Sequence, residues 1–212
     1  FNFMTCAHPG CRTYICEDGP FCFRHSPNQE ELQSRCIQLL QSESSMVDFS
    51  LTGSEFEDLK LPKKEIIASN LAWCTFRNID FSHTTLINTF FDFCLFDHCT
   101  FNGILSRYTV FSGSKMIDCD FSGSIIIHTN FCGVDTYRCN FNDCDLYFST
   151  FNSSYLRDTS FEDCNLKKAD FVHTDQRRVS LRYSNYEETA IEHLSALFRR
   201  RLLQHLSGSL QE

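Results

Sequence analysis

The sequence predicts an all-β solenoid, in which the chain winds into stacked coils around a filled interior. Two observations lead to this fold class. Phenylalanine is unusually frequent, at 22 of 212 residues, and an apolar side chain stands at nearly every fifth position from Leu71 to Phe171. Apolar residues recur every three or four positions in a helix and alternate in a strand, so neither element explains this spacing. A unit of five residues cannot bury its apolar side chain alone, so consecutive units must coil and stack.

Each unit has a second inward position, two residues before the apolar one. Small side chains occupy it almost throughout, as in "CDFSG" (119–123), "CNFND" (139–143) and "TSFED" (159–163). On these units, residues 66–175 resemble the pentapeptide-repeat family. The resemblance implies a right-handed quadrilateral β-helix in which four units make one coil.

A coil of four units requires the pattern to recur every 20 residues, and it does. Two sets of apolar residues fall on opposite faces of the expected tube: Leu71, Phe91, Phe111, Phe131, Phe151 and Phe171 on one, and Phe81, Phe101, Phe121, Phe141 and Phe161 on the other. We therefore expect two phenylalanine ladders to fill the tube. At a β-type spacing of about 4.8 Å per coil, residues 66–175 predict about 5 to 6 coils and a rod of about 26 Å.

A cluster of cysteines and histidines precedes the repeats, in "TCAHPGCRTYICEDGPFCFRHS" (5–26). Thiolate and imidazole groups at this spacing are typical of a structural Zn²⁺ site, with two ligands on a turn and two from a Cys-x-x-His pair. The predicted ligands are Cys6, Cys11, Cys22 and His25. Two alternatives stay open: Cys16 in place of Cys6, or His8 in the ligand set. Residues 1–26 form the predicted zinc module, because so small a segment needs metal to fold.

The remaining segments are assigned by their capping signals and apolar stripes. Ser26 and Pro27 predict the start of a helix within residues 27–45. Residues 46–175 form the predicted β-helix, with an irregular first coil that closes the tube. Residues 176–212 hold a predicted C-terminal helix from Tyr186 to about Leu206 and a tail. Both helices flank the solenoid.

One side of the predicted rod carries an apolar outer surface. Its outward residues include Ile87, Phe90, Phe93, Leu105, Tyr108, Ile125, Ile127, Tyr147 and Phe148. Contiguous exposed apolar area is uncommon on monomers and marks a surface that something covers. Three things could cover this surface: a partner protein, a second copy of the chain, or one of the chain's own terminal helices. A second copy could also be joined through the C-terminal helix instead of this face.

These features predict a non-enzymatic protein-interaction scaffold with a structural zinc site. No catalytic motif such as GxSxG, HExxH or a P-loop occurs. The alternative is an acidic DNA mimic that binds DNA gyrase or another topoisomerase, because some members of the family protect gyrase from quinolones in this way. The repeats carry 13 acidic and 7 basic residues. This negative balance argues against a chain that itself binds nucleic acid.

The sequence also indicates where the chain works. No apolar run approaches the roughly 18 residues that a membrane-spanning helix needs, and the first residues resemble no secretory signal. The 13 cysteines are odd in number and spread through a phenylalanine-rich core, which favours reduced thiols over a disulfide framework. We therefore expect a cytoplasmic protein without a membrane partner.

Overall fold

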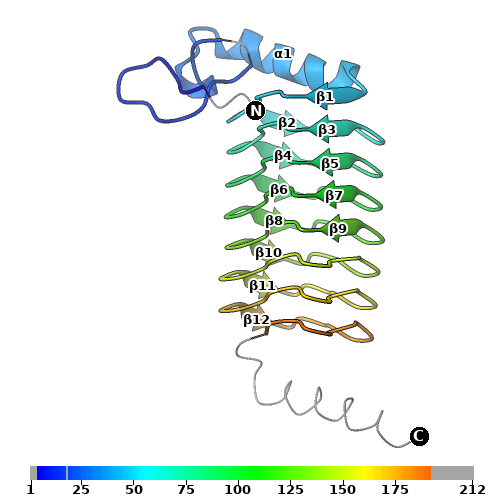
Figure 1. Cartoon of the computed structure of the whole chain (residues 1–212). Coiled ribbons are helices and arrows are strands. Elements are labelled where there is room, and N and C mark those ends of the chain that lie inside the picture. The colour runs from blue at the N-terminus through cyan, green and yellow to red at the C-terminus, as the bar shows by residue number, and fades with distance from the viewer. Residues whose placement is uncertain (1–3, 18, 192–212) are drawn as a thin grey trace, which may run out of the picture.

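The computed structural model describes residues 4–17 and 19–191. An N-terminal module with a short 3₁₀ helix, η1 (Phe23–His25), leads into helix α1 (Gln29–Ser42), and a single β-solenoid follows (Figure 1). The predicted all-β solenoid is therefore confirmed, and α1 is the helix expected in residues 27–45.

Parallel strands of three residues form two sheets on different sides of the tube. The five-stranded sheet contains β1 (Ser45–Val47), β3 (Glu65–Ile67), β5 (Thr85–Ile87), β7 (Leu105–Arg107) and β9 (Ile125–Ile127). The seven-stranded sheet contains β2 (Glu55–Glu57), β4 (Thr75–Arg77), β6 (Leu95–Asp97), β8 (Lys115–Ile117), β10 (Asp135–Tyr137), β11 (Tyr155–Arg157) and β12 (Asp175–Arg177). Neighbouring strands pair at an offset of one coil, as where Phe76 faces Phe96. The predicted period of 20 residues is thus confirmed.

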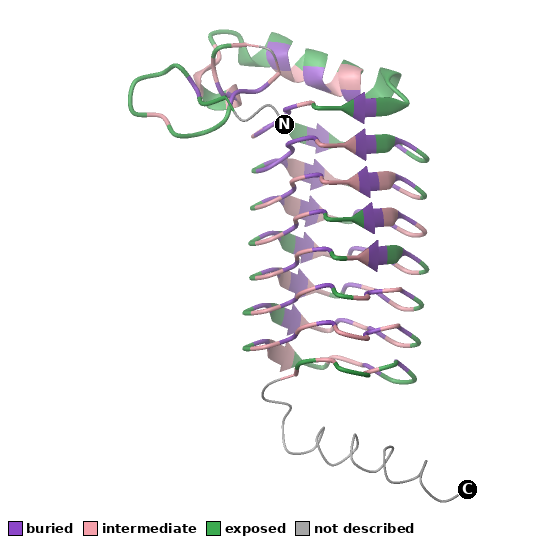
Figure 2. Cartoon of the chain, viewed as in Figure 1, coloured by how far each residue is buried: buried purple, intermediate pink, exposed green. Residues whose placement is uncertain are grey.

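The two phenylalanine ladders fill the interior, and the inward side chains from Leu51 to Thr174 are all buried (Figure 2). Within a ladder the rings stack face to face, with centroids 4.5 Å apart for Phe101 and Phe121 and 5.0 Å apart for Phe111 and Phe131. Between the ladders the rings meet edge to face, as Phe111 and Phe121 do at 89°. The edge-to-face contacts are a favourable arrangement for aromatic quadrupoles.

The small inward position has a hydrogen-bonding role as well as a size limit. Its side chain donates to a backbone carbonyl of the preceding coil: Ser114 Oγ to Phe91 O at 2.7 Å, Thr84 Oγ1 to Leu61 O at 3.0 Å, and Cys144 Sγ to Phe121 O at 3.0 Å. A buried carbonyl without a donor is costly. This explains why Ser, Thr and Cys occupy most of these positions, which size alone does not.

The repeat frame is longer than the sequence indicated. It starts at Met46, whose strand β1 pairs in register with β3, so the first coil is regular and the prediction of an irregular one is wrong. It continues to Ala190, which pairs with Asp170. At about 4.8 Å per coil, residues 46–190 make a rod of about 35 Å instead of the expected 26 Å.

The C-terminal helix does not begin where it was predicted. Asn185 pairs with Asn165 and Ala190 with Asp170, both in parallel bridges, so residues 185–190 continue the last coil. A side chain at 186 is part of that coil, because Tyr186 OH donates to Leu181 O. The rest of the predicted helix, to Leu206, lies outside the described residues.

Helix α1 lies across the N-terminal end of the tube (Figure 1). Its N-cap is Asn28, whose Oδ1 accepts from the Glu31 N–H at 3.3 Å, and not the predicted Ser26. Leu32, Cys36 and Leu40 are its buried residues and belong to the same apolar cluster as the first coil. The helix therefore covers core that an unprotected first coil would expose to water.

Candidate metal centre and interaction face

The N-terminal module brings the predicted metal ligands together from two short elements. A turn through Gly10, whose φ of +78° suits glycine, is closed by the Cys11 N–H donating to His8 O at 3.0 Å. This turn lies between Cys6 and Cys11. Helix η1 then places Cys22 and His25 on one side, with the His25 N–H donating to Cys22 O at 3.1 Å.

The four predicted ligand atoms lie within 4.8 Å of one another. His25 Nδ1 is 3.5 Å from Cys6 Sγ and 3.4 Å from Cys22 Sγ, and Cys11 Sγ is 3.9 Å from Cys22 Sγ. Tetrahedral zinc, with Zn–S of about 2.3 Å and Zn–N of about 2.0 Å, has edges of about 3.8 Å between sulfurs and about 3.5 Å between sulfur and nitrogen. The spacing of the donor atoms thus fits a tetrahedral ion.

The two alternative ligands have other places in the structure. The His8 ring stacks on the His25 ring, with centroids 3.9 Å apart, and its backbone N–H donates to Cys6 Sγ at 3.5 Å. Cys16 is buried outside the cluster, and its Sγ lies 3.6 Å from Cys36 Sγ on α1. Neither alternative joins the cluster that the described residues form.

Burial and hydrogen bonding set the protonation of the cluster. Burial raises the pKa of Cys22 to about 11, while hydrogen bonds from Thr13 lower the pKa of Cys11. Burial also lowers the pKa of His25, and the charges of His8 and Arg24 lower it further. A neutral imidazole is the form that binds metal, and a cation would stabilise the thiolates that burial disfavours.

The module is attached to the first coil and to α1. Cys16 forms an antiparallel bridge with Leu51, and Ser50 Oγ donates to Ile15 O at 2.6 Å. An ion pair of 2.8 Å joins Arg35 of α1 to Glu17 of the module. These contacts hold the Cys/His cluster close to the capped end of the rod.

The predicted apolar surface lies on the outer side of the five-stranded sheet and on the corner beside it. We call the following residues the apolar face: Ile87 on β5, Leu105 on β7, Ile125 and Ile127 on β9, Tyr147 in the same column, and Tyr108 and Phe148 at the corner. Among them Tyr108, Ile125 and Phe148 are 57%, 47% and 43% exposed, and the others are half-buried. Phe90 and Phe93 lie on the adjoining side of the tube.

The corners carry aromatic ladders that sequence reasoning did not identify. The residue two places after each inward apolar one adopts a left-handed conformation, as Tyr108 does at φ 53°. Because corners repeat in register, rings on successive coils stack: Tyr108 on His128 at 5.2 Å, and His128 on Phe148 at 5.0 Å. Trp73, which is 58% exposed and stacks on Phe93 at 4.5 Å, was also missed. In the sequence, these ladders could have been found only by comparing, from coil to coil, the residue two places after each inward apolar one.

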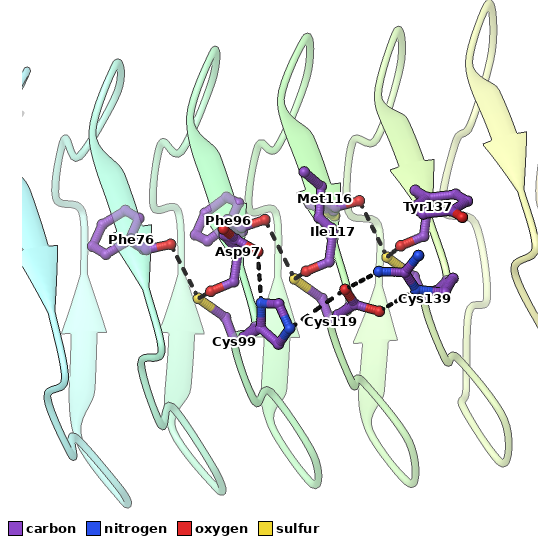
Figure 3. Close-up of polar contacts among 12 residues, drawn as sticks. Phe76, Phe96, Asp97, Cys99, Met116, Ile117, Cys119, Tyr137 and Cys139 are labelled. Atoms are coloured by element: carbon purple, nitrogen blue, oxygen red, sulfur yellow. Dashed lines mark hydrogen bonds and ion pairs between the residues drawn. The ribbon is translucent and has the colours of Figure 1, made fainter.

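The stacked cysteines of the repeats are packing residues. Cys99, Cys119 and Cys139 are buried, and their thiols donate to Phe76 O, Phe96 O and Met116 O at 3.4, 3.7 and 3.5 Å (Figure 3). On the outside of the same coils Asp118 lies between His98 and Arg138 and pairs with both. These contacts form a ladder of polar side chains along one corner, in which Asp118 and Arg138 are an ion pair.

A shallow groove on the seven-stranded sheet is lined by Asp135, Tyr155, Arg157, Asp175 and Arg177. Its charged groups pair with one another, Arg157 with Asp135 and Arg177 with Asp175. Such pairing leaves little free charge for acid–base chemistry. In the part of the chain that the structure describes, no helix combines the length and apolarity that crossing a bilayer requires.

Comparison with known proteins agrees with the repeats. The family model for pentapeptide repeats matches eight copies, over residues 67–103 and 139–175. No curated protein matches the chain.

Several solved structures are similar at low identity. Trypsin-treated QnrB1, a plasmid-mediated fluoroquinolone resistance protein, is 13% identical over 77% of this chain and 89% of that one, with a TM-score of 0.37. Rfr23 from the cyanobacterium Cyanothece 51142 is 13% identical over 75% and 99%, with a TM-score of 0.40. HetL from Nostoc sp. strain PCC 7120, involved in heterocyst differentiation regulation, is 12% identical over 78% and 95%, with a TM-score of 0.25. Through its matched repeats and the four-sided coil that they build, the chain belongs to the pentapeptide-repeat family.

Proposed function

We propose that this chain is a non-enzymatic protein-interaction scaffold, in which a rigid rod presents the apolar face to a protein partner and the N-terminal cluster holds one structural Zn²⁺. The observation that carries the scaffold function is the exposure of Tyr108, Ile125 and Phe148, which come from three successive coils on one side of the rod. Monomeric proteins seldom leave a contiguous apolar surface uncovered.

The rod is suited to presenting a surface because its interior is filled and its backbone is paired from coil to coil. The stacked rings and the inward hydroxyl and thiol donors leave little freedom for the coils to shift. A rigid element loses little conformational entropy when it binds, so more of the contact energy contributes to affinity.

Zinc is the metal that the donor set favours. Three thiolates and one imidazole at tetrahedral spacing suit Zn²⁺ better than hard cations, which prefer oxygen. The expected stoichiometry is one ion per chain, measured by native mass spectrometry before and after chelation. Cys22→Ser should lose the ion, and the matched variant Cys132→Ser, at a half-buried cysteine of the repeats, should keep it. A chain purified with zinc in the medium that carries no ion would contradict the zinc site.

The cytoplasm is the proposed compartment. All 13 cysteines lie in the described residues and none forms a disulfide, which fits a reducing environment.

The acidic DNA mimic stays the second candidate. Asp118, Asp135 and Asp158 each pair with an arginine, so part of the negative charge that would attract a DNA-binding surface is neutralised. An effect of the purified chain on gyrase supercoiling would favour this function over the scaffold.

The scaffold function is tested by photo-crosslinking in the native cell. A photoreactive phenylalanine analogue replaces Ile125 in one variant and Tyr155 in the other. Tyr155 is a matched position, because it is 57% exposed but lies on β11 of the other sheet. We expect a covalent adduct with a polypeptide, of whatever identity, from position 125 and not from position 155. Absence of any adduct at 125 would refute the proposal.

A further inference from the structure

We propose that residues 192–206 of this chain lie back along the rod, cover the apolar face and are displaced from it by the protein partner. This inference rests on the proposed function, because it states how access to the same surface is regulated. Residues 192–212 lie outside the described residues. The inference therefore comes from the surface next to them, from the place where the described chain ends, and from their sequence.

The described chain ends beside the apolar face. Ala190 pairs with Asp170, and the pairing continues coil by coil along one column of outward residues to Val110. Val110 comes two positions after Tyr108, so this column runs next to the corner that carries Tyr108 and Phe148. The segment from residue 192 onward thus starts on the side of the rod that holds the apolar face, at the end opposite helix α1 (Figure 1).

The distance along the rod matches the length of the segment. Phe148 and Tyr108 lie two and four coils from Glu188, the last residue of their corner, which is about 10 and 19 Å. The backbone of the last coil runs around the tube, so a single right-angle turn directs the chain back along it. A helix from Leu194 to Leu206 would rise about 18 Å, which spans the apolar corner.

The sequence of the segment supplies an apolar stripe for this surface. Leu194, Phe198, Leu202 and Leu206 recur every four positions, which is the spacing that brings side chains to one side of a helix. An isolated helix of this length is marginal in water, so it needs a surface on which to pack. Packing on the apolar face would remove the apolar area of both from water.

An acidic side chain on this surface also gains a partner. Asp145 follows Ile125 in its column and accepts from Asn165 Nδ2 at 2.8 Å, but no described basic residue forms an ion pair with it. It lies two coils, about 10 Å, from the last coil. On a helix Arg199 and Arg201 flank the stripe, about 8 and 11 Å from its first residue. The arginines therefore come level with Asp145.

The open end of the tube is the other surface within reach, and it suits an apolar stripe less well. Two inward positions of the last coil hold the polar side chains Gln176 and Tyr186. Gln176 Nε2 donates to Thr174 Oγ1 at 2.9 Å, and Tyr186 OH donates to Leu181 O. An apolar stripe above these groups would take water from them without adding a hydrogen bond, which is unfavourable.

A cover that belongs to the same chain regulates access to the face. A tethered segment acts at an effective concentration that reaches the millimolar range for a short connection, so it occupies the face when no partner is present. The apparent affinity of a partner then falls by the fraction of chains in which the face is open. If that fraction is about 10% or less, weakening the cover should strengthen partner binding at least about tenfold.

The test is photo-crosslinking of the purified full chain, with the photoreactive phenylalanine analogue at position 125 or at the matched position 155. Position 125 should link to a peptide within residues 192–206, in a product of monomer mass whose yield does not depend on protein concentration. Position 155 should not form this link. Phe198→Asp/Leu202→Asp should abolish the link from position 125. Ala196→Asp/Gln204→Asp, which adds two carboxylates on the opposite side of a helix, should keep it. Circular dichroism verifies that each variant is folded.

The same analogue tests displacement in the native cell. Phe198→Asp/Leu202→Asp should increase the adduct between position 125 and the partner. Three results would overturn the inference: no link to residues 192–206, a link that forms only between two chains, or a partner adduct that this variant leaves unchanged. A partner adduct without the internal link overturns the cover and keeps the scaffold function. The internal link without a partner adduct in either variant keeps the cover and removes the scaffold function.

Discussion

The phenylalanine ladders make a quantitative prediction about Phe121→Ala. The Phe121 ring is fully buried and stacks on Phe101 at 4.5 Å and on Phe141 at 4.6 Å, with two further rings edge-on at 6.1 Å. Burying such a side chain stabilises the fold by about 3 kcal/mol. Truncation leaves a void that the rigid coils above and below cannot close, which raises the expected loss to about 4 kcal/mol.

The matched substitution is Phe171→Ala, in the last phenylalanine of the other ladder. Its ring stacks on one neighbour, Phe151 at 4.9 Å, and meets Phe161 edge-on. With fewer aromatic contacts the expected loss is about 3 kcal/mol. Phe148→Ala removes a ring that is half exposed at a corner, and we expect less than about 1 kcal/mol.

The assay is urea unfolding followed by far-UV circular dichroism. Because each coil contacts only its neighbours, a weakened central coil should also reduce cooperativity, seen as a lower m-value or a second transition for Phe121→Ala. A larger loss in the free energy of unfolding for Phe148→Ala than for Phe121→Ala, or a loss below about 1 kcal/mol for Phe121→Ala, would refute the assignment of the ladder as the main source of stability.

Three further predictions concern the cluster, the outer ion pairs and the thiols. Chelation, or Cys22→Ser, should remove protection from amide exchange in the N-terminal module and leave the central coils protected, since the solenoid has its own core. Hydrogen bonds and charge from Arg138 hold the pKa of Asp118 below its usual value. The pair therefore stabilises the fold at neutral pH, and this contribution is lost as the pH falls through the lowered pKa. Arg138→Gln should raise the pKa of Asp118 measured by NMR, and the loss of stability that this substitution causes at neutral pH should vanish in acid. Iodoacetamide should alkylate Cys132 first in the zinc-loaded protein and reach the sulfur ligands only after chelation, as mass spectrometry can follow.

The sequence predicted the central coils because one unit repeats there without interruption. It predicted an irregular first coil, and not the regular one observed, because large residues stand in the small position: Leu59 is buried there, and Lys64 donates from it to Gln41 O and Glu43 O at the end of α1. Lys64 fits because the end of a helix, and not another coil, adjoins it. The last coil was missed for a related reason, since the polar Gln176 holds an apolar position and donates to Thr174 Oγ1 at 2.9 Å.

The metal cluster was predictable because ligand type and spacing are both local properties of a short segment. The choice among six Cys and His side chains was not, since it depends on where the chain returns. Cys16 contacts Cys36 on α1 instead. Cys36 is 20 positions further along the chain and outside the module, so the spacing of residues within the module does not indicate this contact. The aromatic corners depend on the left-handed backbone of each unit, as at Trp73 with φ 63°, and hydrophobic periodicity carries no such signal.

Helix α1 has a consequence for growth of the rod. A stack of parallel strands presents unpaired N–H and C=O groups at its end, and any such edge can template the addition of further chains into a fibre. With α1 seated across the first coil, and Lys64 turned toward the carbonyls of that helix, polymerisation cannot start from this end. Removal of residues 27–42 should therefore convert a discrete particle into one that elongates from its N-terminal end.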